Sequence, residues 1–255
     1  MLVLKSWESP ISHLPDMKVG EAELVTVSST PGIYRRYCLG PNGYEGSDAI
    51  YYRAKKTLKI RSLRIEGKEW MVDDPPHWWA MIEHAKHYSG HVIVAGLGMG
   101  LILYTMRANF NITKITVVEK CHDVIKMMFP PLQEQAHGFV PISLIHGDFW
   151  EYAKLGGNYD GVFYDLLVGN GDDLQGQAIG DMLKIKRLFS TAKTFRIHGM
   201  SNEYLNELTD GIRHVETSYH QFFHQCGNKA GQELLKMINV QFSGTVLNIP
   251  PGPNA

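Results

Sequence analysis

Residues 92–104 have the sequence VIVAGLGMGLILY, in which three glycines at alternate positions separate two apolar runs. A short apolar run that ends at glycine predicts a buried strand, and the longer run after the glycines predicts a helix. Glycine adopts positive φ without strain and lets the backbone approach a ligand closely. The stretch therefore predicts a strand–turn–helix unit whose turn faces a bound molecule.

The segments around this unit also alternate between strand and helix patterns. A helix is expected over residues 76–88, because Pro75 and Pro76 stand at its start and Gly90 follows its end. Strands are expected at residues 91–96, 114–120, 143–148, 159–167 and 193–199, with helices between them and after the last. Two terminal strands, at 215–223 and 233–242, would pair as an antiparallel hairpin. We therefore predict an α/β fold, with a Rossmann-like, doubly wound sheet of seven strands over residues 76–255.

The chain changes character near residue 75. Upstream of it, β-branched and aromatic runs are separated by turn signals such as Pro31-Gly32 and Glu66-Gly67. This pattern predicts a small antiparallel sheet of hairpins, with strands at 24–29, 33–39, 49–54 and 57–65. Residues 1–75 are accordingly expected to form an N-terminal β-rich segment that serves as a lid or as the surface of a homodimer.

The composition excludes several classes of protein. The chain of 255 residues has 25 basic and 26 acidic side chains, so it lacks the basic excess typical of a nucleic-acid binder, although residues 53–64 form one local basic stretch. Its three cysteines, Cys38, Cys121 and Cys226, are too few and too scattered for a disulfide framework. No apolar run is long enough for a signal peptide or a membrane span. We expect a cytoplasmic protein without a membrane or nucleic-acid partner.

Acidic residues follow the glycine turn at the ends of three successive predicted strands. Glu119 can accept hydrogen bonds from both hydroxyls of a ribose, and Asp148 from an adenine amino group while Phe149 packs on the ring. Asp165 ends the next strand and would face the reacting centre. The spacing Gly96-x-Gly98-x-Gly100 differs from the dinucleotide fingerprint, and the turn lacks the Lys-Ser/Thr of a phosphate-binding loop. Three acids at consecutive strand ends describe an adenosine site with no anion to neutralise, which favours S-adenosylmethionine, whose sulfonium is positive, over the pyrophosphate of NAD.

Residues 57–200 resemble the class I S-adenosylmethionine-dependent methyltransferases, and more narrowly their spermidine synthase branch. Val94 stands where most of these methyltransferases have an acid and the branch has a hydrophobic residue. The segment LRIEGKEWMVDDPPHWWAMIEHA, residues 63–85, resembles the hairpin and helix that lead into the turn in the branch. The resemblance implies that Gly96, Gly98 and Gly100 pass under the methionine part of the cofactor.

The sequence also departs from the polyamine synthases that it resembles. Their turn has an Asp where this chain has Met99, and their Tyr-His-Glu cluster for the amine is replaced by Trp78-Trp79-Ala80. Of their two carboxylates after the fourth strand, only Asp165 is matched. We therefore expect a methyltransferase acting on a small-molecule acceptor, with Asp165 as the catalytic base. The alternatives are an aminopropyltransferase using decarboxylated S-adenosylmethionine, another reaction of the same cofactor, or an inactive nucleoside-binding or partner-binding subunit.

Three other motifs allow more than one interpretation. Residues 73–78, DDPPHW, resemble a signature of amino-methylating DNA methyltransferases, but they lie too close to the turn for a permuted domain and fit a helix start better. The histidine groups His84/His87/His91 and His220/His224 with Cys226 lack the partners of a zinc site, so we expect no metal. Asp172 and Asp173 form either a solvated turn or an attraction for a cationic substrate.

Overall fold

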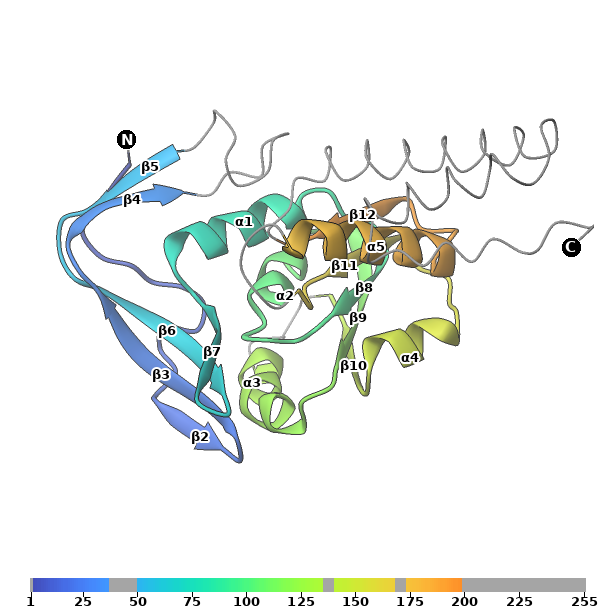
Figure 1. The fold of residues 1–255 in the computed structure, drawn as a ribbon, viewed down its shortest axis with the longest axis horizontal. Coiled ribbons are helices and arrows are strands. Elements are labelled where there is room, and N and C mark those ends of the chain that lie inside the picture. The colour runs from blue at the N-terminus through green and yellow to red at the C-terminus, as the bar shows by residue number, and fades with distance from the viewer. Residues whose placement is uncertain (1, 37–49, 135–139, 168–172, 199–255) are drawn as a thin grey trace, which may run out of the picture.

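The computed structural model describes residues 2–36, 50–134, 140–167 and 173–198. Its centre is a five-stranded parallel sheet in the order β10-β9-β8-β11-β12 (Figure 1). These strands are β8 (Gly90–Ala95), β9 (Ile112–Glu119), β10 (Ile142–His146), β11 (Gly161–Tyr164) and β12 (Thr194–Ile197). In chain order this is the 3-2-1-4-5 arrangement of a Rossmann-like sheet, whose order reverses beside its first strand. The prediction of a doubly wound α/β fold is confirmed.

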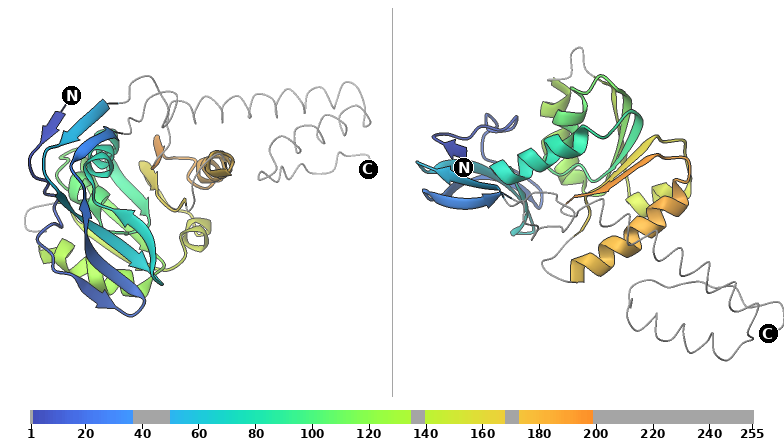
Figure 2. Two further views of the ribbon diagram at one scale, coloured as in Figure 1. Left: turned by 60° about the vertical axis from the view of Figure 1, so that its left-hand side comes forward. Right: turned by 90° about the horizontal axis from the view of Figure 1, so that it is seen from above.

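Helices cover both faces of this sheet because its strands alternate between two hydrophobic cores. Val92 and Val94 of β8 face a core that includes the helices α1 (Pro75–Ala85), α2 (Leu101–Met106) and α3 (His122–Glu134). Ile93 and Ala95 face the opposite core, with α4 (Phe149–Lys154) and α5 (Asp173–Leu188). Figure 2 shows the two groups of helices on opposite sides of the sheet. Both sides of β8 are thus shielded from water, which explains its uninterrupted apolar run.

The N-terminal segment forms two small sheets beside this domain. One is antiparallel, in the order β2-β3-β6-β7, with β2 (Met17–Val19), β3 (Ala22–Ser29), β6 (Leu58–Ile65) and β7 (Lys68–Val72). The other joins β1 (Leu2–Leu4), β5 (Ile50–Ala54) and β4 (Gly32–Arg36). Leu24 and Leu63 of the first sheet belong to the same buried cluster as α1, α2 and α3. The segment therefore packs directly on the Rossmann-like domain, and its role as a lid or dimer surface stays a prediction.

Several elements differ from those expected from the sequence. The strands β1 and β2 and the short helix α4 were not predicted, whereas β7 is the second strand of the hairpin that the resemblance over residues 63–85 implied. Helix α1 begins at Pro75, one residue before the expected start, with Asp74 as its N-cap, and ends at Ala85 instead of residue 88. The expected helix after residue 199 and the terminal strands at 215–223 and 233–242 lie outside the described residues. The described sheet therefore has five strands, and the sixth and seventh stay a prediction.

The expectations about the cysteines and about membrane spans can be compared with the structure in part. Cys121 is a free thiol, whereas Cys38 and Cys226 lie outside the described residues. Among the described helices, none combines the length and the apolar character needed to cross a membrane.

Candidate functional site

The carboxyl ends of the five parallel strands lie in one row. Ala95 of β8 is paired with Val118 of β9 and with Tyr164 of β11, and the outer strands continue this register. Backbone hydrogen bonds extend the ladder by one further residue, as from Asp165 N to the Ala95 carbonyl. The row one step beyond Ala95 therefore consists of His146, Glu119, Gly96, Asp165 and His198. Because neighbouring strands are about 4.8 Å apart, these residues form one continuous edge.

The glycine turn at this edge has a conformation that requires glycine. Gly96, Gly98 and Gly100 have φ of 91°, 49° and 72°, in the region that side chains disfavour. The two residues between them, Leu97 and Met99, are buried in the core below. A Cβ on Gly98 would lie 2.5 Å from Sδ of Met71, which itself accepts a hydrogen bond from Met99 N at 3.2 Å. The backbone of the turn is therefore held close to β7, with no space for a side chain at Gly98.

Glu119 connects the turn to the end of β9. One carboxylate oxygen accepts a hydrogen bond from Leu97 N at 2.7 Å and the other from Cys121 N, also at 2.7 Å. These bonds fix the orientation of the carboxylate beside the glycine turn. Each oxygen has two lone pairs, so a second acceptor position is left on each. The arrangement fits the expected contact with the two hydroxyls of a ribose, which stays a prediction.

Asp148 caps helix α4, a role that the sequence analysis did not include. Its Oδ1 accepts hydrogen bonds from Trp150 N at 2.9 Å and Glu151 N at 3.3 Å, and its Oδ2 pairs with Lys120 Nζ at 3.2 Å. These interactions lower the pKa of Asp148, with the Lys120 hydrogen bond as the largest cause. The side chain is 36% exposed, so Oδ2 is the oxygen that a ligand could reach.

The structure places Phe149 differently from the expectation. Its side chain is only 3% exposed and packs against Tyr164 and Phe189 in the core shared with α5. The ring has no exposed face for an adenine. The reason is that Phe149 is the first residue of α4, and this short helix turns its side chain inward onto α5.

Asp165 follows β11, next to Gly96 in the row of strand ends. A Cβ on Gly96 would lie 3.3 Å from the Asp165 carbonyl oxygen, so the two backbones are in close contact. Burial raises the pKa of the Asp165 carboxyl to about 6, and the opposing effect of His77 is smaller. A carboxyl group with a pKa near the working pH is suited to accept a proton.

Three imidazoles form a cluster on the side of Asp165 away from the glycine turn, and the sequence analysis did not bring them together. His77 and His84 lie on α1, while His198 follows β12 in the row of strand ends. The rings of His77 and His198 are stacked with centroids 4.5 Å apart, and the His84 ring meets His198 edge-on at 5.8 Å. The signal for His198 was present, because it lies near the carboxyl end of a predicted strand as the three acids do.

The imidazole cluster is neutral at pH 7 and incompletely hydrogen-bonded. Burial lowers the pKa of His77 to about 3 and of His198 to about 4, and lowers that of His84 well below its ordinary value. Nε of Arg196 donates to Nδ1 of His84 at 3.0 Å, so the proton of the neutral His84 ring lies on Nε2. Within the described residues, His77 Nε2, His84 Nε2 and His198 Nδ1 have no hydrogen-bond partner although they are buried.

The first histidine group noted in the sequence, His84, His87 and His91, does not come together in the structure. His84 contacts Arg196, His87 pairs with Glu83 at 3.5 Å, and His91 contacts Thr116 at 2.9 Å. No group of three metal-ligating side chains occurs in the part of the chain that the structure describes. His220, His224 and Cys226 lie outside it, as does Asp172.

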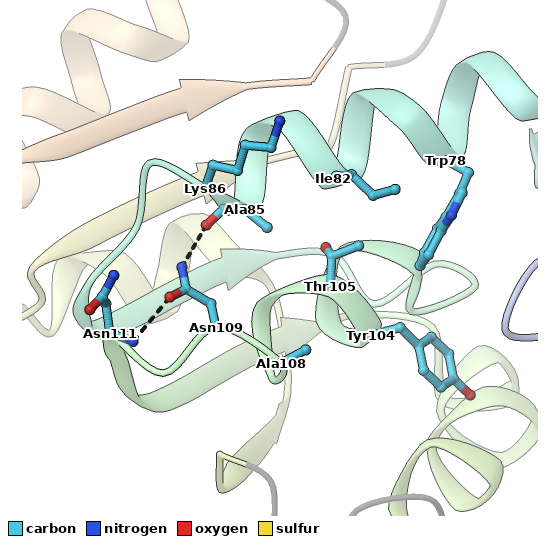
Figure 3. A pocket seen from close by; sticks show the side chains of 9 residues that line it. All are labelled: Trp78, Ile82, Ala85, Lys86, Tyr104, Thr105, Ala108, Asn109 and Asn111. Carbon is cyan, nitrogen blue, oxygen red and sulfur yellow. Dashed lines mark hydrogen bonds between the residues drawn. The ribbon is translucent and has the colours of Figure 1, made fainter.

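An open pocket of about 500 Å³ lies elsewhere, between α1 and α2 (Figure 3). It extends from Trp78 and Tyr104 to the loop before β9, where Nδ2 of Asn109 donates to the carbonyl of Ala85 at 2.9 Å. No carboxylate lines this pocket. The row of strand ends, with its carboxylates and imidazoles, is therefore the better candidate for a reactive site.

Comparison with known proteins gives similarity of fold only. No protein-family model matches the chain, and no curated protein matches it. Among solved structures it is similar to spermidine synthase from Thermotoga maritima, with 11% identity and a TM-score of 0.39 over 66% of this chain and 64% of that one. A spermidine synthase in complex with the transition state analogue AdoDATO gives 10% identity and a TM-score of 0.40, with the same coverage. A methyltransferase from Geobacter sulfurreducens has 18% identity to this chain and a TM-score of 0.33, over 46% of this chain and 55% of that one.

The chain thus spans less than two thirds of the length of each of these structures. These three structures are spermidine synthases and a methyltransferase, the kinds of protein that the sequence was found to resemble. At these identities the likeness concerns the fold alone, so the chemistry has to come from the residues of this chain.

Proposed function

We propose that this protein is an S-adenosylmethionine-dependent transferase, and most specifically a methyltransferase that acts on a small-molecule acceptor. The observation that carries the proposal is the row of strand ends, in which the left-handed glycine turn lies between Glu119 and Asp165. In Rossmann-like sheets the ligand binds at this edge, where the strand order reverses.

The residues at the edge fit the parts of the cofactor. Glu119 would accept the ribose hydroxyls, Asp148 would receive the adenine amino group through Oδ2, and the glycine turn would lie under the methionine part. Met71 now contacts the turn at Gly98 and Met99, so its flexible side chain would have to adopt another rotamer. When bound, the cofactor would supply a methyl group already activated by a sulfonium.

The chain itself would then contribute position and proton removal. Positioning of two reactants supplies up to about 7–11 kcal/mol of a barrier in favourable cases. Asp165 would accept the proton of the incoming nucleophile. An amine acceptor is less well supported, because Asp165 stands without the second carboxylate of the polyamine synthases.

Calorimetric titration tests this proposal. The full chain is titrated with S-adenosylmethionine, decarboxylated S-adenosylmethionine, S-adenosylhomocysteine and NAD. We expect S-adenosylmethionine and S-adenosylhomocysteine to bind. Their affinity should be lower by about tenfold or more in Glu119→Ala, because two charge-assisted hydrogen bonds are lost. Preference for the decarboxylated form would favour aminopropyl transfer instead. Absence of binding by all four would refute an adenosine site.

A further inference from the structure

Beyond the cofactor site, we propose that His77 and His198 bind the acceptor next to Asp165, and that this acceptor carries an uncharged phenol-type hydroxyl instead of a protonated amine. The inference rests on the proposed function, because the acceptor site has meaning only beside a bound sulfonium. It adds the chemical class of the substrate and the residues that select it.

The first argument is the place of the cluster. His198 is next to Asp165 in the row of strand ends, and Asp165 is next to Gly96. The acceptor must reach the carbon bound to sulfur, so it has to lie beside Asp165. On the side of Asp165 away from the glycine turn, the next strand end is that of His198, whose ring stacks on His77 at 4.5 Å.

The second argument is the unused hydrogen-bonding capacity. Buried polar atoms nearly always have a partner, and exceptions call for an explanation. Here three imidazole nitrogens in one cluster lack a hydrogen-bond partner among the described residues. They are His77 Nε2, His84 Nε2 and His198 Nδ1. A hydroxyl both donates and accepts one hydrogen bond, so it can satisfy neutral imidazoles of either tautomer.

The third argument is charge. Arg196 is 6% exposed, and its guanidinium donates to His84 at 3.0 Å. Negative charge that develops on an acceptor oxygen would be attracted by this guanidinium, although a protonated amine would in turn be attracted by the Asp165 carboxylate. Since Arg196 donates to Nδ1, it also polarises the Nε2–H of His84 as a donor. Arg196 and His84 are therefore positioning residues behind the stacked rings.

The fourth argument is the match of acidity. The pKa of the Asp165 carboxyl is about 6. This is roughly four units below the pKa of a phenol and nearly ten below that of an aliphatic alcohol. The smaller gap makes proton removal during transfer easier. The oxygen–carbon bond would form while the carbon–sulfur bond breaks, the electron pair of the latter would stay on sulfur, and the hydroxyl proton would pass to the Asp165 carboxylate.

The test uses two probes of equal size, 4-methylphenol and benzylamine, with toluene as the apolar control. The full chain, labelled with ¹⁵N-histidine and saturated with S-adenosylhomocysteine, is titrated while the ring nitrogens are followed by NMR. We expect 4-methylphenol to shift the His77 and His198 signals and to bind about tenfold more tightly than benzylamine.

Two variants complete the design. His198→Phe keeps an aromatic ring stacked on His77. It should weaken the binding of 4-methylphenol by about fivefold to tenfold, while the affinity for S-adenosylhomocysteine changes by less than about twofold. His87→Phe, in the turn that follows α1, replaces a half-exposed histidine, so it is the matched control and should change neither. Equal or tighter binding of benzylamine overturns the proposal, as does phenol binding that leaves the ring nitrogens unchanged, or no probe binding in a protein that binds S-adenosylhomocysteine. If S-adenosylhomocysteine itself fails to bind, the proposed function fails and the acceptor site with it.

Discussion

Replacing Asp165 by Asn should stabilise the fold while it abolishes turnover. Burial raises the pKa of this carboxyl from 3.8 to about 6, and each unit corresponds to about 1.4 kcal/mol. At pH 7.5 the side chain is ionised in both the folded and the unfolded state, so the folded state carries the full penalty of about 3 kcal/mol. Asn carries no charge to bury, and we expect a melting temperature higher by about 5–10 °C.

The pH dependence of this gain separates burial of charge from other effects. Below pH 6 the folded wild type takes up a proton at Asp165, and below pH 3.8 the unfolded chain does so as well. The advantage of Asn should therefore shrink as the pH falls and vanish near pH 4. Urea unfolding at pH 7.5, 6 and 4.5 measures it, with Glu151→Gln as a surface control whose effect should stay within about 0.5 kcal/mol. A gain that is the same at all three pH values, or a loss at pH 7.5, would refute the reasoning.

Two further predictions concern the turn and the ribose position. Gly98→Ala should destabilise the protein by about 1–3 kcal/mol in urea unfolding, because φ is 49° and the new Cβ meets Met71 Sδ at 2.5 Å. Gly147→Ala, where no atom lies within 4 Å, should stay within about 0.5 kcal/mol, and equal effects would contradict this explanation. Glu119→Gln should weaken S-adenosylmethionine binding by about tenfold in calorimetry, because an amide cannot accept from two backbone N–H groups and two hydroxyls at once; unchanged affinity would remove Glu119 from the site.

The sequence was sufficient for the parts of the site that depend on local pattern and strand order. The glycine turn, Glu119 and Asp165 each lie at the carboxyl end of a predicted strand, and parallel strands end at the same edge. Phe149 was misplaced because a short helix begins at that residue and turns it inward. The imidazole cluster was missed because it depends on long-range packing, with His84 and Arg196 separated by 112 residues. No local pattern indicates that α1 will lie along the ends of β11 and β12.

The imidazole cluster should itself destabilise the protein, which is the reason to expect a function for it. Burial lowers the pKa of His198 from 6.5 to about 4, and one of its nitrogens has no partner among the described residues. His198→Phe keeps the stacking on His77 and removes both effects, so it should stabilise the fold. Because the unfolded chain binds the His198 proton below pH 6.5 and the folded chain only near pH 4, this gain should grow by up to about 3 kcal/mol as the pH falls from 7 to 4.

That trend is opposite to the one for Asp165→Asn, so urea unfolding of both variants across the same pH range tests the two groups independently. If His198→Phe instead destabilised the protein at every pH, the His198 imidazole would contribute to the stability of the fold, and the expected cost of burying it would be refuted. If it stabilises the fold and also weakens the binding of 4-methylphenol, then His198 lowers the stability of the protein and contributes to binding. This combination is common where activity requires a strained or unsatisfied site.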